Sequence, residues 1–375
     1  MKKFTWLLPV LLGCPPSVPE DTDSTDTSTD TDTGVDTDTD VEPVEVTVVI
    51  ATVAADFSVG SLAEVSGDDF SVSDELAPLT SDPAVITDDG KVIVLGRYGF
   101  DSVRVYAAGD YAVPETEFST GEGSNPQDAA ICGGDLFVSL YGDDEVRAYN
   151  LEGELQGSVS LEAYSDEDGI PEASSMVEID GVVYVALNIL DQDGGFQSAG
   201  PGQVVAIDCE TRTVLENYAV GPNPSIEVFP GDAGRLLVRT GVYYVPDDGA
   251  LSYLTLEDGE VHEWVSEGDL EADLTEVASS DAGALLISQD TGTSQYSLWC
   301  VNAATGGTSL LGTTFSYIND ATVDANGFAW VAAREGYTEE VSVAGVAVYD
   351  LTSCEAVNEG DWLSLSLPPY AIATY

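Results

Sequence analysis

Carboxylates dominate the side chains of this chain that could do chemistry. The 375 residues include 68 Asp and Glu but only 10 Lys and Arg, for a formal net charge of −58. Two carboxylates at a suitable separation perform general acid and base chemistry in glycoside hydrolases. With so many acids a pair can be assembled anywhere, so the presence of a pair identifies no active site.

A single histidine, His262, stands in the alternating run EVHEW. One histidine excludes a histidine-rich zinc site such as HExxH. No serine or cysteine stands in a recognisable nucleophile motif, and there is no Walker-type phosphate loop. We therefore predict a surface histidine on an outer strand, no catalytic residue, and a protein that is not an enzyme.

Two short clusters resemble parts of calcium-binding loops: Asp166 with Asp168, and Asp191 with Asp193, each followed by glycine. Calcium prefers carboxylate oxygens, but neither cluster has the downstream glutamate of an EF-hand. Asp and Gly are also the residues that ordinary turns require. We predict no cofactor, with calcium as the alternative.

The charge balance excludes one class of partner. A phosphate backbone would be repelled by so acidic a chain, so nucleic acid is not a partner. Such a surface suits solubility, high ambient salt or divalent cations, and the plain alternative is a solvated acidic surface without a specific role.

Short alternating runs rich in Val, Thr and Tyr, each ended by Gly, Asp or Asn, dominate the chain after residue 43. No long stretch shows apolar residues at the 3.6-residue helical period, so the predicted class is all-β. One unit is especially clear: residues 181–187, 203–208, 213–220 and 225–228 predict four short strands in series.

Versions of this unit recur along the chain. A turn followed by two short apolar strands begins near Asp82, Pro126, Ser175, Pro224, Thr275 and Asn319. Starts roughly 45 to 50 residues apart are typical of four-stranded propeller blades.

The two ends of the chain complement each other. A seventh start, at Pro369, has no strands after it, whereas residues 44–79 contain strands but no such start. We predict that residues 370–375 form the innermost strand of a blade completed by residues 44–79. This pairing removes two unpaired sheet edges and gives a closed ring of seven blades.

The clear unit resembles the YVTN-type propeller repeat of bacterial surface-layer and YncE-like proteins. The matching segments are VYV at 183–185, VAID at 205–208, Thr213 and VGPNP at 220–224, with an echo in VAVYDLT at 346–352. The resemblance implies a β-propeller and says little about function.

In a propeller, the first residues of the inner strands ring one mouth of the central channel, where ligands usually bind. The candidate binding residues are Asn125, Asp128, Glu172, Asn223, Asp320 and Tyr370. The alternative is that Asn, Asp and Pro are simply the residues that such turns need.

Four cysteines follow residue 14: Cys132, Cys209, Cys300 and Cys354. The last three each follow a predicted third strand at equivalent positions of different blades. Equivalent positions lie too far apart for the Cα separation of about 4–7 Å that a disulfide needs. We therefore predict no bridge or one.

The start of the chain has the features of an export signal. Lys2 and Lys3 precede an apolar stretch over residues 4–12, too short to span a bilayer. The ending LLGC resembles the bacterial lipobox, which implies that Cys14 is lipidated and becomes the new N-terminus. Because Pro15 rather than Asp follows it, the resemblance favours the outer membrane or cell surface.

Residues 20–40 form a low-complexity Asp/Thr tract that cannot bury enough apolar surface to order itself. The predicted organisation is therefore a signal peptide over residues 1–13, a lipidated cysteine and acidic tether over 14–43, and a propeller over 44–375.

The resulting hypothesis is a lipid-anchored binding or scaffold module of the cell envelope, with an envelope protein or a small molecule as its partner. One alternative is a propeller enzyme of lactonase or lyase type, and another is a structural acidic envelope protein. Arginines or carboxylates converging at the channel mouth would favour the enzyme. A broad apolar or aromatic patch would favour a protein partner, and a uniformly acidic surface the structural role.

Overall fold

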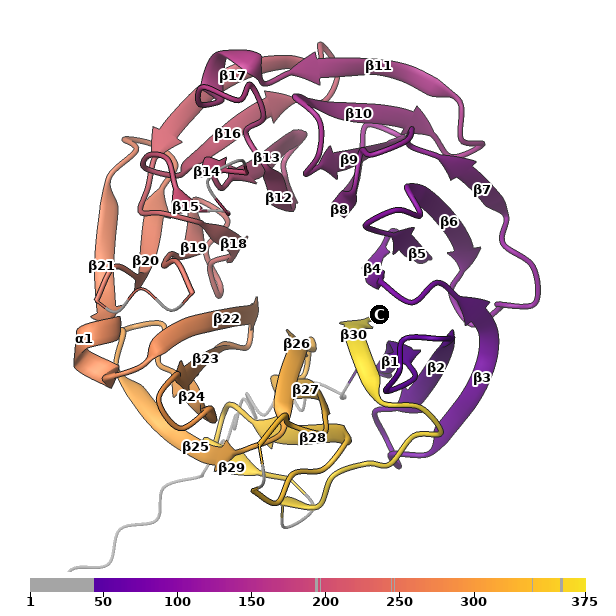
Figure 1. Cartoon of the computed structure of the whole chain (residues 1–375), viewed down its shortest axis with the longest axis vertical. Coiled ribbons are helices and arrows are strands. Elements are labelled where there is room, and N and C mark those ends of the chain that lie inside the picture. Colours follow the sequence, from indigo (N-terminus) through magenta and orange to yellow (C-terminus); the bar gives the residue numbers. More distant parts are fainter. Residues whose placement is uncertain are drawn as a thin grey trace, which may run out of the picture. The chain divides into compact units, whose positions relative to one another are not determined.

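A computed structural model describes residues 44–375 apart from 193, 194, 196, 244, 246, 339, 358 and 359. The described chain forms seven antiparallel four-stranded sheets in a ring around a central channel (Figure 1). The predicted seven-bladed β-propeller is confirmed. The signal peptide, Cys14 and the tether lie outside the described residues. Within the described ranges, no helix has the length and apolar character needed to cross a membrane.

The blades are named A to G here, with strands given from the channel outward. Blade A contains β30 (Pro369–Thr374), β1 (Thr47–Val53), β2 (Gly60–Ser66) and β3 (Val72–Leu79). Blade B contains β4 (Pro83–Asp88), β5 (Lys91–Gly96), β6 (Ser102–Ala107) and β7 (Thr116–Ser119). Blade C contains β8 (Pro126–Cys132), β9 (Asp135–Leu140), β10 (Glu145–Asn150) and β11 (Leu155–Ser160). Blade D contains β12 (Ala173–Ile179), β13 (Val182–Leu187), β16 (Gln203–Asp208) and β17 (Thr213–Ala219).

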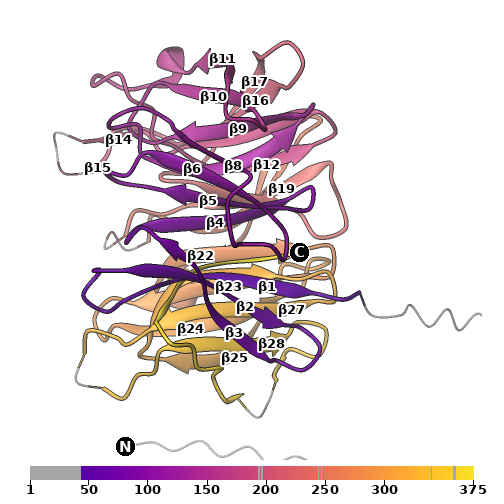
Figure 2. The same ribbon diagram turned by 90° about the vertical axis from the view of Figure 1, so that its right-hand side faces the viewer.

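Blade E contains β18 (Ser225–Val228), β19 (Arg235–Arg239), β20 (Ala250–Thr255) and β21 (Val261–Ser266). Blade F contains β22 (Asp273–Ser280), β23 (Gly283–Asp290), β24 (Gln295–Val301) and β25 (Thr308–Thr314). Blade G contains β26 (Tyr317–Val323), β27 (Phe328–Arg334), β28 (Gly345–Asp350) and β29 (Glu355–Ala356). A hairpin of β14 (Leu190–Asp191) and β15 (Gln197–Ser198) projects from one face of the ring (Figure 2). The short helices are η1 (Glu162–Tyr164) and α1 (Glu267–Leu270).

The second strand of each blade supplies most of the core. In β5 (KVIVLG) and β27 (FAWVAAR) every residue after the first is buried. Such strands read as continuous apolar runs because both of their faces pack against neighbouring blades. Outer strands differ: in β17 (TVLENYA) only Val214 and Tyr218 are partly buried, and the other residues are exposed.

The ring closes by pairing the two ends of the propeller. β30 lies antiparallel to β1, with Ile372 opposite Ile50 and Ala373 opposite Val49. Both isoleucines are buried, at 3% and 0% exposure. The predicted closure is therefore confirmed, and it leaves neither end of the ring with an open inner edge.

Side chains also tie each blade to the next at the innermost strands. At all seven boundaries a side chain of one inner strand exchanges a hydrogen bond with the backbone of the neighbouring inner strand or the residue after it. In order around the ring from the A–B boundary, these side chains are Thr87, Asp88, Asp128, Ser175, Ser279, Ser280 and Asp320.

Two disulfides join neighbouring blades, so the prediction of at most one bridge is wrong. Cys132 is bonded to Cys209 across blades C and D, and Cys300 to Cys354 across blades F and G, with Cα atoms 5.9 and 5.7 Å apart. The error lay in treating the last three positions as equivalent. Cys300 lies inside β24, whereas Cys354 lies in the turn after β28, which brings it next to the neighbouring blade.

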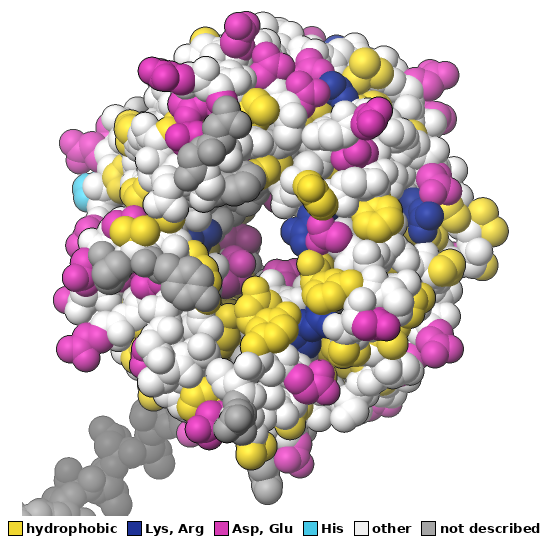
Figure 3. All heavy atoms as spheres, in the orientation of Figure 1, with side chains coloured by type: hydrophobic (Ala, Val, Ile, Leu, Met, Phe, Trp, Pro, Cys, Tyr) yellow, Lys and Arg dark blue, Asp and Glu magenta, His cyan; other side chains and the backbone are white. Residues whose placement is uncertain are grey.

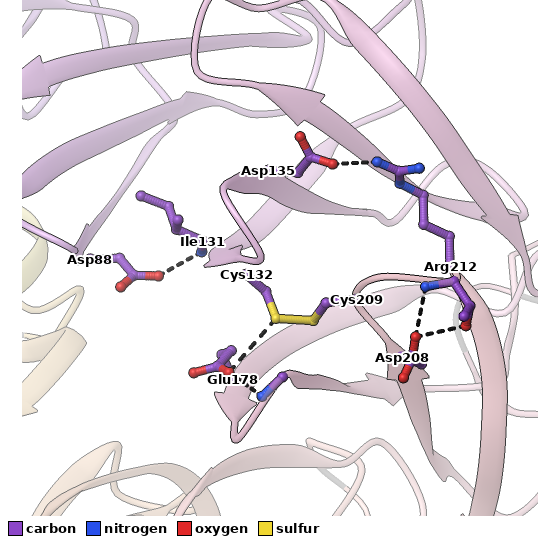
Figure 4. Close-up of a disulfide and its surroundings, with 10 residues drawn as sticks. Asp88, Ile131, Cys132, Asp135, Glu178, Asp208, Cys209 and Arg212 are labelled. Carbon is purple, nitrogen blue, oxygen red and sulfur yellow. Dashed lines mark hydrogen bonds and ion pairs between the residues drawn. A yellow bond between two sulfur atoms is a disulfide. The ribbon is translucent and has the colours of Figure 1, made fainter.

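The surroundings of the first bridge reinforce the same boundary. Asp135 of β9 forms an ion pair with Arg212, in the turn that follows Cys209 (Figure 4). A covalent bond and an ion pair therefore connect blades C and D within a few residues of each other.

We predict that removing the first bridge with the double substitution Cys132→Ser/Cys209→Ser lowers the free energy of unfolding by roughly 2–5 kcal/mol, because the bridge closes a long loop in the unfolded chain. Urea unfolding measures the change. Cys300→Ser/Cys354→Ser is the matched variant, with a sequence separation of 54 against 77. Unchanged stability in both variants would contradict a stabilising role for the bridges.

Candidate functional site

The innermost strands of all seven blades enclose a central cavity of about 800 Å³. All seven inner strands run in the same direction, so their first residues meet at one mouth of this cavity. The second strand of each blade runs back antiparallel, so its last residue lies at the same mouth. Two sets of residues therefore converge there from every blade.

Backbone bulges aim several side chains into the cavity. Five of the seven inner strands, β8, β12, β22, β26 and β30, show a register shift near their start. A bulge adds an unpaired residue and redirects side chains locally. The bulge residues that line the cavity are Gln127, Asp128, Ser174, Ser175, Asn319 and Tyr370.

Three arginines line the cavity: Arg97, Arg239 and Arg334. Each stands at or just after the end of a second strand. Eight of the chain's ten basic residues lie in the described part, so the channel takes a large share of them. Figure 3 shows dark blue side chains around the central opening. The other five form ion pairs away from the channel: Lys91, Arg104, Arg147, Arg212 and Arg235.

Arg97 is neutralised by the protein itself. Its Nη2 lies 2.6 Å from Oδ1 of Asp82. The hydroxyl of Tyr370 donates to the same oxygen, at 2.9 Å. This arginine is therefore part of a closed polar network in the channel wall.

Arg239 and Arg334 are not neutralised in this way. Nε of Arg239 donates to Oγ of Ser225 at 3.1 Å. Arg334 is 4% exposed, donates Nη2 to the carbonyl of Ala54 at 3.2 Å, and lies 4.5 Å from the ring centroid of Phe57. Its Nη1 is buried without a hydrogen-bond partner. Among the described residues, neither guanidinium has a carboxylate as an ion-pair partner.

Asp128 and Asp320 occupy corresponding places in blades C and G. Each accepts the N–H of the following residue through Oδ1, at 2.8 Å. Through Oδ2 they accept the N–H of Met176 and Ile372 in the next blade, at 2.7 and 2.9 Å. Burial raises the pKa of both carboxyl groups to about 7, and for Asp320 the negative charge of Glu276 adds to this effect. These two acids join blades as well as line the channel.

Glu227 and Glu276 lie in the same cavity, on β18 and β22. Burial raises the pKa of both side chains. The negative charges of Glu276, Asp128 and Asp320 raise the pKa of Glu227 further. The positive charge of Arg239 lowers the pKa of Glu276 and so opposes the effect of burial. A carboxyl group with a raised pKa holds its proton to a higher pH, and in that form it can serve as a general acid or as a hydrogen-bond donor to a ligand.

The residues predicted at the mouth divide into two groups. Asp128, Asp320 and Tyr370 line the central cavity, and Asn223 lines a smaller pocket beside it. Asn125 and Glu172 are absent from both linings, within the described part of the chain.

Turn geometry explains three of these positions. Asn125, Glu172 and Asn223 each precede an inner strand and have φ of 48°, 48° and 47°, the left-handed region in which Asn is among the favoured non-glycine residues. Glu172 is fully buried and accepts the N–H of Leu190 and the side-chain amide of Gln192, which anchors the β14–β15 hairpin. Burial raises the pKa of Glu172 to about 7. The left-handed backbone of these three positions suits the alternative role in the turns, and Asn223 also lines the smaller pocket.

In the acidic loop suggested for calcium, the carboxylates of Asp166 and Asp168 accept hydrogen bonds from backbone N–H groups of the same loop. Asp166 accepts the N–H of Asp168 at 3.0 Å, and Asp168 accepts the N–H of Ile170 at 2.8 Å. Asp193 lies outside the described residues, and Asp191 lies in β14. No group of three or more His, Cys, Asp or Glu side chains in the described ranges is arranged to hold a metal ion.

His262 lies on β21, the outer strand of blade E, as its alternating run predicts. Its side chain is 42% exposed and stacks on Tyr253, with ring centroids 4.7 Å apart. Because β21 is the outermost strand of blade E and β18 the innermost, His262 lies away from the channel.

The sequence contained a signal for the channel arginines that the prediction missed. An arginine ends or follows an apolar second strand in VIVLGR, RLLVR and AWVAAR, in a chain where basic residues are rare. Glu227 and Glu276 gave no comparable signal, because an isolated acid inside an inner strand does not stand out among 68.

Comparison with known proteins identifies the fold alone. No protein-family model matches the chain, and no curated protein matches it in sequence. Solved structures match well: the periplasmic gluconolactonase of Pseudomonas aeruginosa has a TM-score of 0.62 at 14% identity, covering 88% of this chain and 99% of that one. A protein from Lactobacillus plantarum has a TM-score of 0.62 at 12% identity, covering 88% and 100%.

A third neighbour shows how little the fold says about function. Hydrazine synthase from Kuenenia stuttgartiensis has a TM-score of 0.54 at 12% identity, covering 72% of this chain and 76% of that one. Proteins with unrelated names share the architecture, so the fold does not identify a function.

The raised pKa values predict a specific pH dependence of stability. Asp128 and Asp320 have a pKa of about 7 in the folded state against an ordinary value of 3.8, so the native protein holds protons that the unfolded chain releases. Their contribution is complete below about pH 4 and is lost as pH rises through about 7, a change on the order of a few kcal/mol. Asp128→Asn/Asp320→Asn should flatten the fall in unfolding free energy between pH 5 and 8.

Urea unfolding across this pH range tests the prediction. Neutralising two exposed acids instead, with Glu152→Gln/Glu257→Gln, controls for general repulsion in so acidic a protein. If the channel variant keeps the full slope of the unmodified protein, the two carboxyl groups do not carry this dependence.

Proposed function

We propose that the protein is a binding module of the cell envelope whose channel mouth holds a small anionic molecule. Arg239 carries the proposal. Its guanidinium lines the cavity, donates to one neutral hydroxyl, and has no carboxylate ion-pair partner among the described residues of a chain with 68 acids. The charges of Glu276 and Glu267 favour the ionised form of Arg239, but neither forms a direct ion pair with it in the described chain. A guanidinium binds a carboxylate or phosphate through two parallel hydrogen bonds, and a ligand would supply this direct partner.

The surrounding charges support this assignment. Arg334 adds a second positive charge without a carboxylate partner in the described chain. Asp128 and Asp320 have pKa values of about 7, so their protonated forms weaken the repulsion of an anion near neutral pH. Burial shifts the pKa values of Glu227 and Glu276 in the same direction. A charge pair enclosed by protein is stronger than one on the exposed surface.

We expect the purified full-length protein to bind small carboxylates or phosphate, and Arg239→Ala to weaken this binding at least tenfold, since a charge-assisted hydrogen bond contributes about 1.5–3 kcal/mol. Isothermal titration calorimetry measures the affinity. Because the whole protein repels anions, raising the salt from about 10 to 150 mM should speed association, as the Debye length falls from about 30 to 8 Å.

Arg104→Ala is the matched control for the loss of one arginine. Arg104 lies on β6 and forms an ion pair with Glu117, with Nε and Oε1 2.8 Å apart, away from the channel. Equal anion affinity in the Arg239 variant and the Arg104 variant would overturn the proposal.

A second candidate function is hydrolysis of a small ester or lactone. The observation that favours it is the convergence of arginines with protonatable glutamates, the pattern that we expected of an enzyme. Glu227 or Glu276 could transfer a proton while an arginine stabilises developing negative charge. One structural neighbour is named as a gluconolactonase, although at 14% identity. Continuing heat release after ligand addition in the calorimeter would support turnover over simple binding.

We also propose that the propeller is exported and held at the outer membrane or cell surface by a lipidated Cys14 and the acidic tether. Two disulfides between blades support an oxidising compartment, because cytosolic proteins rarely keep such bonds. Two or more acyl chains on one cysteine give stable membrane anchoring where a single chain is marginal.

Cys14→Ser should move the protein from the membrane fraction to the soluble fraction and abolish labelling with radioactive fatty acid. Cys132→Ser/Cys209→Ser is the matched control, because it removes two cysteines but leaves the anchor. Retention of the Cys14 variant in the membrane fraction would contradict lipid anchoring through this residue.

A further inference from the structure

A smaller pocket of about 230 Å³ opens beside the central cavity, between blades E, F and G. Arg239, Glu276, Tyr317 and Asn319 line both spaces, so the two are contiguous. We propose that this side pocket receives the six-membered ring of a hydroxylated ring carboxylate whose anionic group pairs with Arg239. The inference rests on the proposed anion site and names the class of its ligand.

Arg239 fixes the position of the anionic group. Its Nε is used by Ser225, and its two terminal nitrogens have no partner among the described residues. Arg239 stands in the wall shared by the two cavities, so a carboxylate bound to it can direct the rest of a molecule into the side pocket. Two parallel hydrogen bonds also fix the orientation of the carboxylate plane.

Aromatic and aliphatic side chains form the body of the side pocket. Tyr243, Tyr296 and Tyr317 line it together with Leu274 and Ile318. Tyr296 is 3% exposed and packs edge-to-face against Tyr317, with ring centroids 6.0 Å apart. A cavity of about 150 Å³ takes benzene, so a pocket of this size suits one six-membered ring with its substituents. Tyrosine faces pack against both aromatic rings and the C–H faces of sugars.

Polar groups in the same wall call for a hydrogen-bond donor on the ring. Oδ1 of Asn319 is buried and has no partner. Leaving a buried acceptor unpaired is costly, and a ring hydroxyl that donates to Oδ1 of Asn319 would satisfy it.

Ligand titrations followed by NMR on the full-length protein test the inference. The probes are acetate, benzoate, 4-hydroxybenzoate, glucuronate and glucose. We expect 4-hydroxybenzoate or glucuronate to bind at least tenfold tighter than acetate, and tighter than benzoate or glucose, which lack the hydroxyl or the charge. The stronger of the two arms distinguishes an aromatic acid from a sugar acid.

Tyr317→Ala should remove most of the advantage over acetate, whereas Tyr317→Phe keeps the ring face and should retain it. Tyr98→Ala is the control, since Tyr98 is 80% exposed and lines neither cavity. Ring acids that bind no tighter than acetate, with acetate still dependent on Arg239, would overturn the side pocket and leave the anion site standing. Equal binding of benzoate and 4-hydroxybenzoate, together with equal binding of glucuronate and acetate, would overturn the role of the hydroxyl. Binding that ignores Arg239 for every probe would overturn both proposals.

Discussion

The pairing of β30 with β1 is the constraint on which the rest of the structure depends. A propeller blade buries both faces of its inner strands against its neighbours, so an open ring would expose two apolar faces and two sheet edges. Supplying the last inner strand from the opposite end of the chain removes all of these at once. The hydrogen bonds between neighbouring inner strands then repeat at every boundary, and the ring holds a cavity of fixed size at its centre.

This arrangement brings charged groups together in the wall of the central cavity. Aspartates at the start of the inner strands accept backbone N–H groups of the next blade, so charges in the channel also hold the ring together. Their burial disfavours the ionised form, and the pKa values rise accordingly. Burial also makes an arginine without a carboxylate partner energetically costly. Arg239 and Arg334 are therefore unusual in a protein with 68 acidic residues.

The disulfides and most ion pairs lie in a different part of each blade from the candidate binding residues. Both disulfides and five of the ion pairs lie away from the channel, where they connect blades or neighbouring strands. The channel mouth carries the arginines, the protonatable acids and the tyrosines. Structural neighbours with unrelated names share the architecture, so the same ring supports different chemistry according to which residues the inner strands and loops present at the mouth.

The sequence by itself determined the class, the blade count and the closure. Alternating apolar runs and turn residues act locally, and their recurrence leaves one strand missing at one end of the chain and present at the other. The candidate site was determined only in part. Asp128, Asp320 and Tyr370 could be found because inner-strand starts share a mouth, but Asn125 and Glu172 were not distinguished from turn residues.

Only the tertiary structure decided the disulfide partners, the ion pairing of each arginine and the side pocket. Arg97 and Arg239 are 142 residues apart and Arg239 and Arg334 are 95 apart, so their convergence depends on how the blades pack. A shift of a few ångströms decides whether a carboxylate forms an ion pair with a given guanidinium. The periodicity of the strands shows which face a residue lies on, but it does not fix distances between blades.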